Sequence, residues 1–270
     1  MCLIHEVGYT LNEAICYEVI HGFDVGGSTT IHSFGAYGGL TISLFLSYMT
    51  KPKTKPLTNY TSNIFAFIGC LFLWMYWPSF NFGYFPKTPF AKTQIISHTI
   101  LSLTGSCLAT FMTSAFLKNK FTMEHLLNAT LAGGVVIGAP AGIMFNSGGA
   151  LAIGFLTGII STLGFQYLTP YLEHKFGIFD TCGVHNLHGI PGILGGFVSA
   201  IVAAVYNWPS TLDAYSITAA DFPEIDTLLA TPYKQGGLQI AILFCSIGIA
   251  IVTGIITGLI LKLVYSWDES

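Results

Sequence analysis

Two histidines each follow an aspartate by eight residues, in stretches that carry no other charge. The first pair is Asp24 and His32, in DVGGSTTIH, and the second is Asp180 and His188, in DTCGVHNLH. An imidazole can donate a hydrogen bond through one ring nitrogen and accept one through the other. An ionisable side chain inside a membrane is costly and marks a substrate path or a proton relay. The repeated spacing therefore predicts a duplicated helix that brings one histidine of each copy into a shared polar path.

The composition places these stretches in a membrane. Hydrophobic residues make up 52% of the chain, charged residues only 9%, and the mean hydropathy is +0.65. Soluble domains carry about 25% charged residues. A membrane-spanning helix needs about 20 apolar residues. Six runs without Lys, Asp or Glu provide them: 25–49, 56–86, 93–117, 125–172, 181–212 and 235–261. The run 125–172 is long enough for two helices, with a predicted break at 146–149. We therefore expect an all-α polytopic membrane protein of about seven transmembrane helices.

The lysines predict the orientation of these helices. If the helices alternate in direction, one side of the membrane carries Lys51, Lys53, Lys55, Lys118, Lys120, Lys175 and Lys262, and the other carries Lys87, Lys92 and Lys234. The side richer in lysine faces the cytosol. Residues 1–24 are then an extracellular lead-in with the N-terminus outside, 25–263 a membrane domain, and 264–270 a short cytosolic tail. The net charge of −3 gives no basic patch for nucleic acid.

In this orientation the two histidine-bearing helices cross in opposite senses. Asp24 lies near the outer face and Asp180 near the inner face, and each histidine lies about 12 Å deeper along its helix. Oppositely threaded repeats share a site near the membrane midplane, so His32 and His188 are predicted to meet at the centre. Eight residues turn a helix about 80° beyond two full turns. Each aspartate should therefore cap its own helix rather than contact its own histidine.

Packing and metal binding were the alternatives for these histidines. A single histidine in an apolar helix commonly forms a hydrogen bond with a neighbouring helix. Two histidines at matching positions of oppositely directed helices instead favour a shared site. His185 lies three residues before His188 and could join it and His32 at a metal, but no carboxylate or further ligand lies beside them in the sequence. We expect neither a metal nor a cofactor. The scattered cysteines lack metal-site spacing.

The sequence after His188, GIPGILGG, indicates an irregular backbone there. Pro191 has no N–H, which frees the carbonyl of Leu187 four residues earlier. Such a backbone is tolerated at membrane depth where it lines a cavity or is buried in protein. Two small-xxx-small motifs, 154–158 and 254–258, are predicted to pack helices.

An aromatic cluster, LFLWMYWPSFN, ends the second predicted span. Trp74, Tyr76 and Trp77 are typical of the belt at a membrane surface. Phe80, just beyond Pro78, is instead predicted to cover the mouth of a pore. Glu124 and His125, which open the fourth span, are predicted to be surface residues.

Several long motifs together resemble the Rh glycoproteins, a branch of the ammonium transporter family. They are DVGGSTTIHSFGAYGGLT, FLWMYWPSFN, NATLAGG, GIISTLGF-x-YLTP and DTCGVHNLHGIPGILGG, from about residue 12 onward. The resemblance implies a homotrimer of eleven- or twelve-helix subunits, each with a central pore, of which this chain matches only the part from the fifth conserved helix. It places the twin pore histidines at His32 and His188 and the flanking aspartates at Asp24 and Asp180. Phe80 matches one of two stacked phenylalanines that close the outer vestibule.

These observations predict ammonium/ammonia transport, with ammonium deprotonated on entry, by a non-enzymatic plasma-membrane protein in contact with lipid. A neutral molecule enters a low-dielectric channel far more cheaply than a cation, and K⁺ has no proton to leave behind. The alternative is a truncated, non-conducting subunit that forms hetero-oligomers with full-length relatives. A third hypothesis is an intramembrane metalloenzyme that uses His32, His185 and His188.

Overall fold

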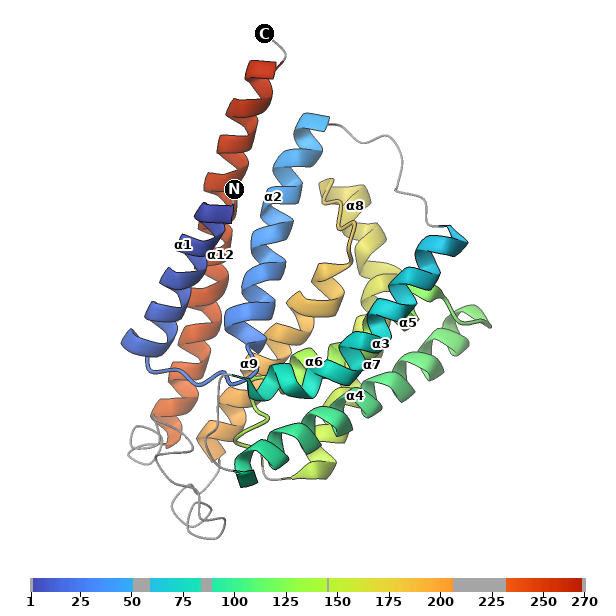
Figure 1. Ribbon diagram of the computed structural model, residues 1–270, viewed down its shortest axis with the longest axis vertical. Coiled ribbons are helices and arrows are strands. Elements are labelled where there is room, and N and C mark those ends of the chain that lie inside the picture. Colours follow the sequence, from blue (N-terminus) through green and yellow to red (C-terminus); the bar gives the residue numbers. More distant parts are fainter. Residues whose placement is uncertain (1, 51–58, 84–88, 145, 206–231, 269–270) are drawn as a thin grey trace.

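The computed structural model describes residues 2–50, 59–83, 89–144, 146–205 and 232–268, and every regular element in these ranges is a helix (Figure 1). The α-helices are α1 (Cys2–Glu13), α2 (Phe34–Thr50), α3 (Tyr60–Phe82), α4 (Pro89–Lys118), α5 (Met123–Asn128), α6 (Ala132–Ile137), α7 (Ser147–Leu163), α8 (Thr169–Phe176), α9 (Ile190–Val205) and α12 (Pro232–Asp268). Short π- or 3-10-helical segments are η1 (Ala14–Val19), η2 (Ser28–Ser33), η3 (Ala129–Leu131), η4 (Gly164–Leu168) and η5 (His185–Gly189).

Five helical stretches are long and apolar enough to cross a membrane: Tyr60–Phe82, Lys92–Lys118, Ser147–Phe176, His185–Val205 and Lys234–Val264. Met123–Ile137 is a shorter apolar stretch, and η2 runs directly into α2. Each of the seven predicted spans therefore contains helix. The predicted all-α polytopic membrane fold is confirmed.

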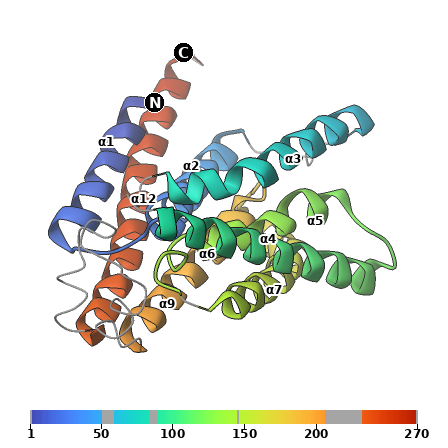
Figure 2. The same ribbon diagram turned by 60° about the horizontal axis from the view of Figure 1, so that its bottom comes forward.

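The helices form two neighbouring groups that meet at α9 and η2 (Figures 1 and 2). Helix α4 packs along α7, and α12 packs along α2 and α9. The small residues in the two predicted motifs serve these contacts. A methyl group on Gly154 would overlap the backbone of Ser102 in α4, and one on Gly254 would crowd Thr41 in α2. Close backbone approach of this kind stabilises helix pairs that have no hydrophobic effect to drive them together.

Helix α1 was not among the predicted elements. It lies antiparallel to α12, and the first residues of α1 are at the same end of the molecule as the last residues of α12 (Figure 1). The segment 1–24, predicted as a lead-in, thus contains a helix packed against the membrane domain. At the other terminus α12 continues to Asp268, through most of the predicted tail.

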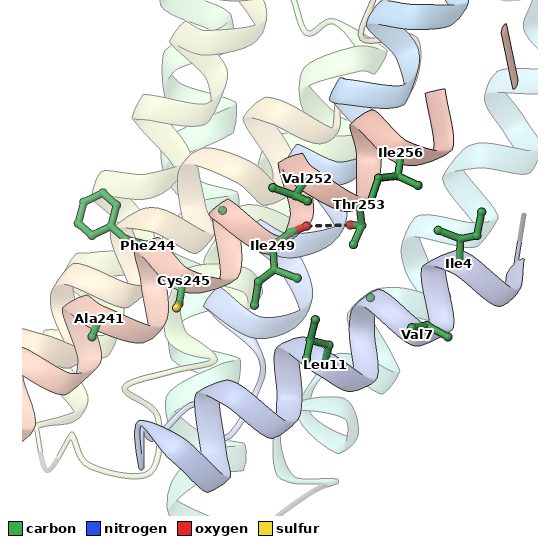
Figure 3. A pocket seen from close by; sticks show the side chains of 12 residues that line it. Ile4, Val7, Leu11, Ala241, Phe244, Cys245, Ile249, Val252, Thr253 and Ile256 are labelled. Carbon is green, nitrogen blue, oxygen red and sulfur yellow. Dashed lines mark hydrogen bonds between the residues drawn. The ribbon is translucent and has the colours of Figure 1, made fainter. Parts of the chain in front are cut away.

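A groove of about 900 Å³ runs between α1 and α12 (Figure 3). Ile4, Val7 and Leu11 line it from α1 and face apolar side chains of α12. The one hydroxyl among its side chains, that of Thr253, donates to the carbonyl of Ile249 at 2.9 Å. The groove therefore offers an apolar surface, as expected for a face that lies against lipid or another membrane helix.

The structure corrects the position of the break within 125–172. Helix α6 ends at Ile137, and α7 begins at Ser147, so the predicted break at 146–149 falls on the first turn of α7. The side chain of Asn146 accepts hydrogen bonds from the N–H groups of Gly148 and Gly149, at 2.8 and 3.2 Å. An asparagine in this position caps a helix rather than interrupting it. Pro140, which cannot continue a helix, lies in the actual break.

The structure also corrects the prediction for His125, while Glu124 is exposed as predicted. The side chain of His125 is only 2% exposed, and its Nδ1 lies 2.9 Å from the hydroxyl of Ser114 in α4. The hydrogen bond explains how a polar ring can be buried at the start of α5.

Candidate functional site

Both histidine-bearing turns, η2 and η5, are π-helical. Such widened turns are rare and often occur at functional sites. A glycine with positive φ precedes each of them: Gly27 at 69° and Gly183 at 68°. Each glycine follows its aspartate by three residues, and its N–H bonds the carbonyl of that aspartate. The sequence repeat is therefore Asp-x2-Gly-x4-His, and the shared glycine is a signal that the Asp–His spacing alone missed.

Asp24 caps the first histidine-bearing helix. Its Oδ2 accepts from the backbone N–H groups of Thr29 and Thr30 at 2.9 and 2.8 Å, and from their hydroxyls at 2.5 and 3.0 Å. The side chain is 2% exposed. A buried carboxylate needs this many donors to offset its lost hydration. The expected capping geometry is confirmed for Asp24.

Asp180 caps the second helix in the same manner. Its Oδ1 accepts from the N–H of Val184 at 2.9 Å, and its Oδ2 accepts from the N–H of His185 at 2.8 Å. This carboxylate is only half-buried. The two aspartates thus fix the entry of both helices, Asp24 through a buried network and Asp180 through a more accessible one.

The rings of His32 and His188 meet, as predicted from the inverted repeat. Their Nδ1 atoms are 3.1 Å apart, and their ring centroids are separated by 5.1 Å with the planes 11° from parallel. His32 is 9% exposed. Since two Nδ1 atoms share one hydrogen bond, one of them carries the hydrogen and the other accepts it.

Trp77 contacts both histidines, which corrects its assignment to the aromatic belt. The indole is 5% exposed, and its ring lies 5.7 Å from that of His32 and 6.5 Å from that of His188, nearly parallel to both. Gly134 in α6 makes this position available, because a methyl group there would overlap the indole. The sequence did hold a signal: Trp77 and Phe80 are three residues apart and share a helix face.

Phe80 covers His32 from the side of α3. Its ring centroid lies 5.4 Å from that of His32, and 46% of its surface is exposed. A partly open cavity of about 380 Å³ is lined by His32, Leu73, Tyr76, Trp77, Phe80, Leu187 and His188. Pro191 is buried in α9 and does not line it.

The lining defines what this cavity can do chemically. Its walls are apolar and aromatic, and its two imidazole side chains are those of His32 and His188. A small neutral molecule that hydrogen-bonds fits such walls, whereas a bare ion would lose hydration without a compensating charge. The cavity therefore favours neutral, hydrogen-bonding solutes.

A metal site does not form from the three histidines considered above. The ring of His185 lies edge-on to that of Tyr37, with centroids 5.8 Å apart. Across the part of the chain that the structure describes, no three side chains of the His, Cys, Asp and Glu types gather closely enough to hold a metal ion. His185 contributes to a different contact, described below.

The fold and the cavity define a multi-pass membrane protein with a histidine pair in an apolar cavity between its helices. The family model described as "Ammonium Transporter Family" matches residues 6–270. This chain belongs to the ammonium transporter family, in its Rh branch.

Similar proteins support the assignment of this chain to the Rh branch. The chain is 44% identical to "Ammonium transporter Rh type C" of Rattus norvegicus, over 97% of this chain and 53% of the relative. It is 44% identical to the type C protein of Canis lupus familiaris, over 100% and 59%, and 41% identical to the type B protein of Danio rerio, over 97% and 58%. The chain thus spans little more than half the length of these relatives.

Solved structures agree with the fold. The chain resembles Nitrosomonas europaea Rh50, of the Rhesus protein family of channels, with a TM-score of 0.77 and 35% identity over 97% of this chain and 62% of that one. A "Sensor Amt Protein" shares the fold with a TM-score of 0.69 and 21% identity, over 90% and 55%.

Proposed function

We propose that this chain conducts ammonia across a membrane through the cavity between α3 and the two histidine-bearing helices. The observation that carries the proposal is the hydrogen-bonded pair of His32 and His188 inside an apolar and aromatic wall. The similar relatives are ammonium transporters, and Nitrosomonas europaea Rh50 is one of the Rhesus family of channels, which supports the proposal.

In this proposal ammonium first meets the aromatic rings of Phe80 and Trp77. The faces of such rings attract a cation within about 6 Å. The cation then gives its proton to solvent water at the entrance, because carrying a bare charge past apolar walls costs far more than carrying neutral ammonia. Ammonia has both N–H donors and a lone pair, so it can bond either ring nitrogen of a neutral imidazole. K⁺ cannot become neutral and is excluded.

The test is flux through the purified 270-residue chain in proteoliposomes. An inward ammonium gradient should alkalinise the lumen faster than in protein-free vesicles, because entering ammonia takes up a proton there. A K⁺ gradient of the same size should give no extra flux, as measured with a potential-sensitive dye. Ammonium entry no faster than in empty vesicles would count against conduction by this chain.

The second candidate is a non-conducting subunit that associates with longer relatives. The apolar groove between α1 and α12, which another membrane helix could cover, favours it (Figure 3). A homotrimer, implied by the resemblance, is the assembly we propose for the conducting form. Native mass spectrometry of the chain, alone and coexpressed with a longer Rh protein, separates the two.

We propose a plasma-membrane location in which the helix ends carrying Lys118, Lys175 and Lys262 face the cytosol. Lys51, Lys53, Lys55 and Lys87 lie outside the described residues. The start of α1 lies at the same end of the molecule as the end of α12 (Figure 1). In this orientation it also faces the cytosol, in place of the outward N-terminus expected from the lysines.

This orientation has a direct chemical test. Cys182 is exposed, two residues after Asp180 at the proposed inner end of its helix. A membrane-impermeant maleimide should label Cys182 only after cells are permeabilised, with Cys182→Ser as the control for other thiols. Equal labelling of intact cells would reverse the proposed orientation.

A further inference from the structure

A second polar pair comes from the same two continuous helical stretches as the histidine pair, η2 with α2 and η5 with α9. Tyr37 follows His32 by five residues on α2, and His185 precedes His188 by three residues in η5. The two helical stretches are proposed to cross the membrane in opposite directions. Residues that follow His32 and residues that precede His188 therefore both lie toward the inner face. The rings of Tyr37 and His185 are in edge-on contact. Their centroids are 5.8 Å apart, and their planes are 74° from parallel.

The polar atoms of this pair both lie beside Gly189. The Nδ1 of His185 is buried and has no hydrogen-bond partner among the residues that the structure describes. A methyl group added to Gly189 would meet this Nδ1 at 3.2 Å and the Oη of Tyr37 at 3.3 Å. Both polar atoms therefore lie close to the same backbone position, Gly189.

The backbone holds His185 in this position. Its N–H donates to Oδ2 of Asp180 at 2.8 Å, which fixes the start of η5. A buried ring nitrogen without a partner is unfavourable, and native structures rarely leave one so. The arrangement is therefore more readily understood as a binding position than as packing alone.

We propose that Tyr37 and His185 form an inner hydrogen-bonding station that receives ammonia after the histidine pair. The proposal rests on the proposed ammonia conduction. Ammonia can donate to the Nδ1 of His185 or accept from it, according to the tautomer, and the tyrosine hydroxyl can take the complementary role. The station lowers the barrier for ammonia to leave the apolar cavity, since each step inward exchanges one hydrogen bond for another.

Substitutions at three positions test the station by ammonia flux in proteoliposomes. Tyr37→Phe removes only an oxygen and should lower the flux by about three- to tenfold, the loss typical of one hydrogen bond. Gly189→Ala places a methyl between the two polar atoms and should have a similar effect. His185→Gln keeps a polar side chain and should retain more flux than His185→Leu, which a purely structural role does not predict. Gly35→Ala on α2, with nothing within 4 Å of the added methyl, is the matched control.

The flux of a double variant tests whether Tyr37 and His185 act together. If the two side chains act on one molecule, Tyr37→Phe should cost little further flux in a chain that already carries His185→Leu. Flux like that of the unsubstituted chain in both Tyr37→Phe and Gly189→Ala would overturn the station. So would equal losses in the Gln and Leu variants of His185.

A binding measurement keeps the two proposals separate. If the unsubstituted chain conducts nothing, the proposed function fails, and the station is tested by NMR of chain labelled with ¹⁵N-histidine. Ammonium chloride at alkaline pH should shift the His185 ring nitrogens, sodium chloride should not, and Tyr37→Phe should weaken the shift. A His185 signal that does not respond to ammonium would refute the station.

Discussion

Replacing His188 with alanine is expected to lower ammonia flux about tenfold or more, a barrier increase of about 1.4 kcal/mol. The substitution removes the hydrogen-bond partner of His32 Nδ1, which lies 3.1 Å away, and one of the two imidazoles in the lining. Ammonia would then cross the cavity with fewer hydrogen bonds to replace its hydration. His32→Ala should cause a loss of similar size.

The control is Leu73→Ala, which alters the same lining without touching a hydrogen bond. It should leave the flux within about twofold, because no polar contact with ammonia is lost. If the histidines act as one unit, the double variant of His32 and His188 should conduct little less than either single variant. Unchanged flux in His188→Ala, measured by the same lumenal alkalinisation, would contradict their role.

Replacing Asp24 with alanine is expected to lower the free energy of unfolding by about 3–5 kcal/mol, the range for breaking a buried, charged hydrogen-bond network. Two N–H groups and two hydroxyls, from Thr29 and Thr30, would lose their shared acceptor. Thermal unfolding of the detergent-purified chain, followed by tryptophan fluorescence, measures the loss. Asp24→Asn should recover part of it, because one amide oxygen can still accept.

Asp180→Ala is the matched control for this prediction. This carboxylate accepts two backbone hydrogen bonds and is only half-buried, so water can replace it. We expect a smaller loss, about 1–2 kcal/mol. Equal destabilisation by the two substitutions would show that the burial of Asp24 does not increase its contribution to the free energy of unfolding.

The histidine pair could be predicted because it depends on quantities that a sequence fixes locally. The rise of a helix and the opposite threading of two similar stretches place His32 and His188 at a common depth. The capping by Asp24 and Asp180 followed from the same spacing. None of this required knowledge of which helices are neighbours.

Two of the missed features depend on contacts between segments that are distant in sequence. Trp77 reaches the histidines because Gly134 in α6 leaves room for its indole. The turn at η2 is held by the hydroxyl of Ser28, which donates to the carbonyl of Val135 at 2.6 Å and accepts from the N–H of Ala139 at 2.7 Å. No local pattern specifies such partners.

Helix α1 was missed for a different reason. Glu6 and Glu13 interrupt its apolar residues, so no charge-free run marks it. Glu6 is exposed, and Leu11 and Val7 instead line the groove against α12. A search for uninterrupted apolar runs overlooks a helix whose charges lie on one side.

The single hydrogen between the two Nδ1 atoms makes a structurally symmetric pair chemically unequal. In neutral rings, the histidine that carries this hydrogen presents a bare Nε2, while its partner presents an Nε2–H. A passing molecule therefore meets an acceptor on one ring and a donor on the other. Moving two protons would exchange these roles. The tautomeric state of His32 and His188 therefore decides which ring offers the donor and which the acceptor, a difference that the backbone repeat does not contain.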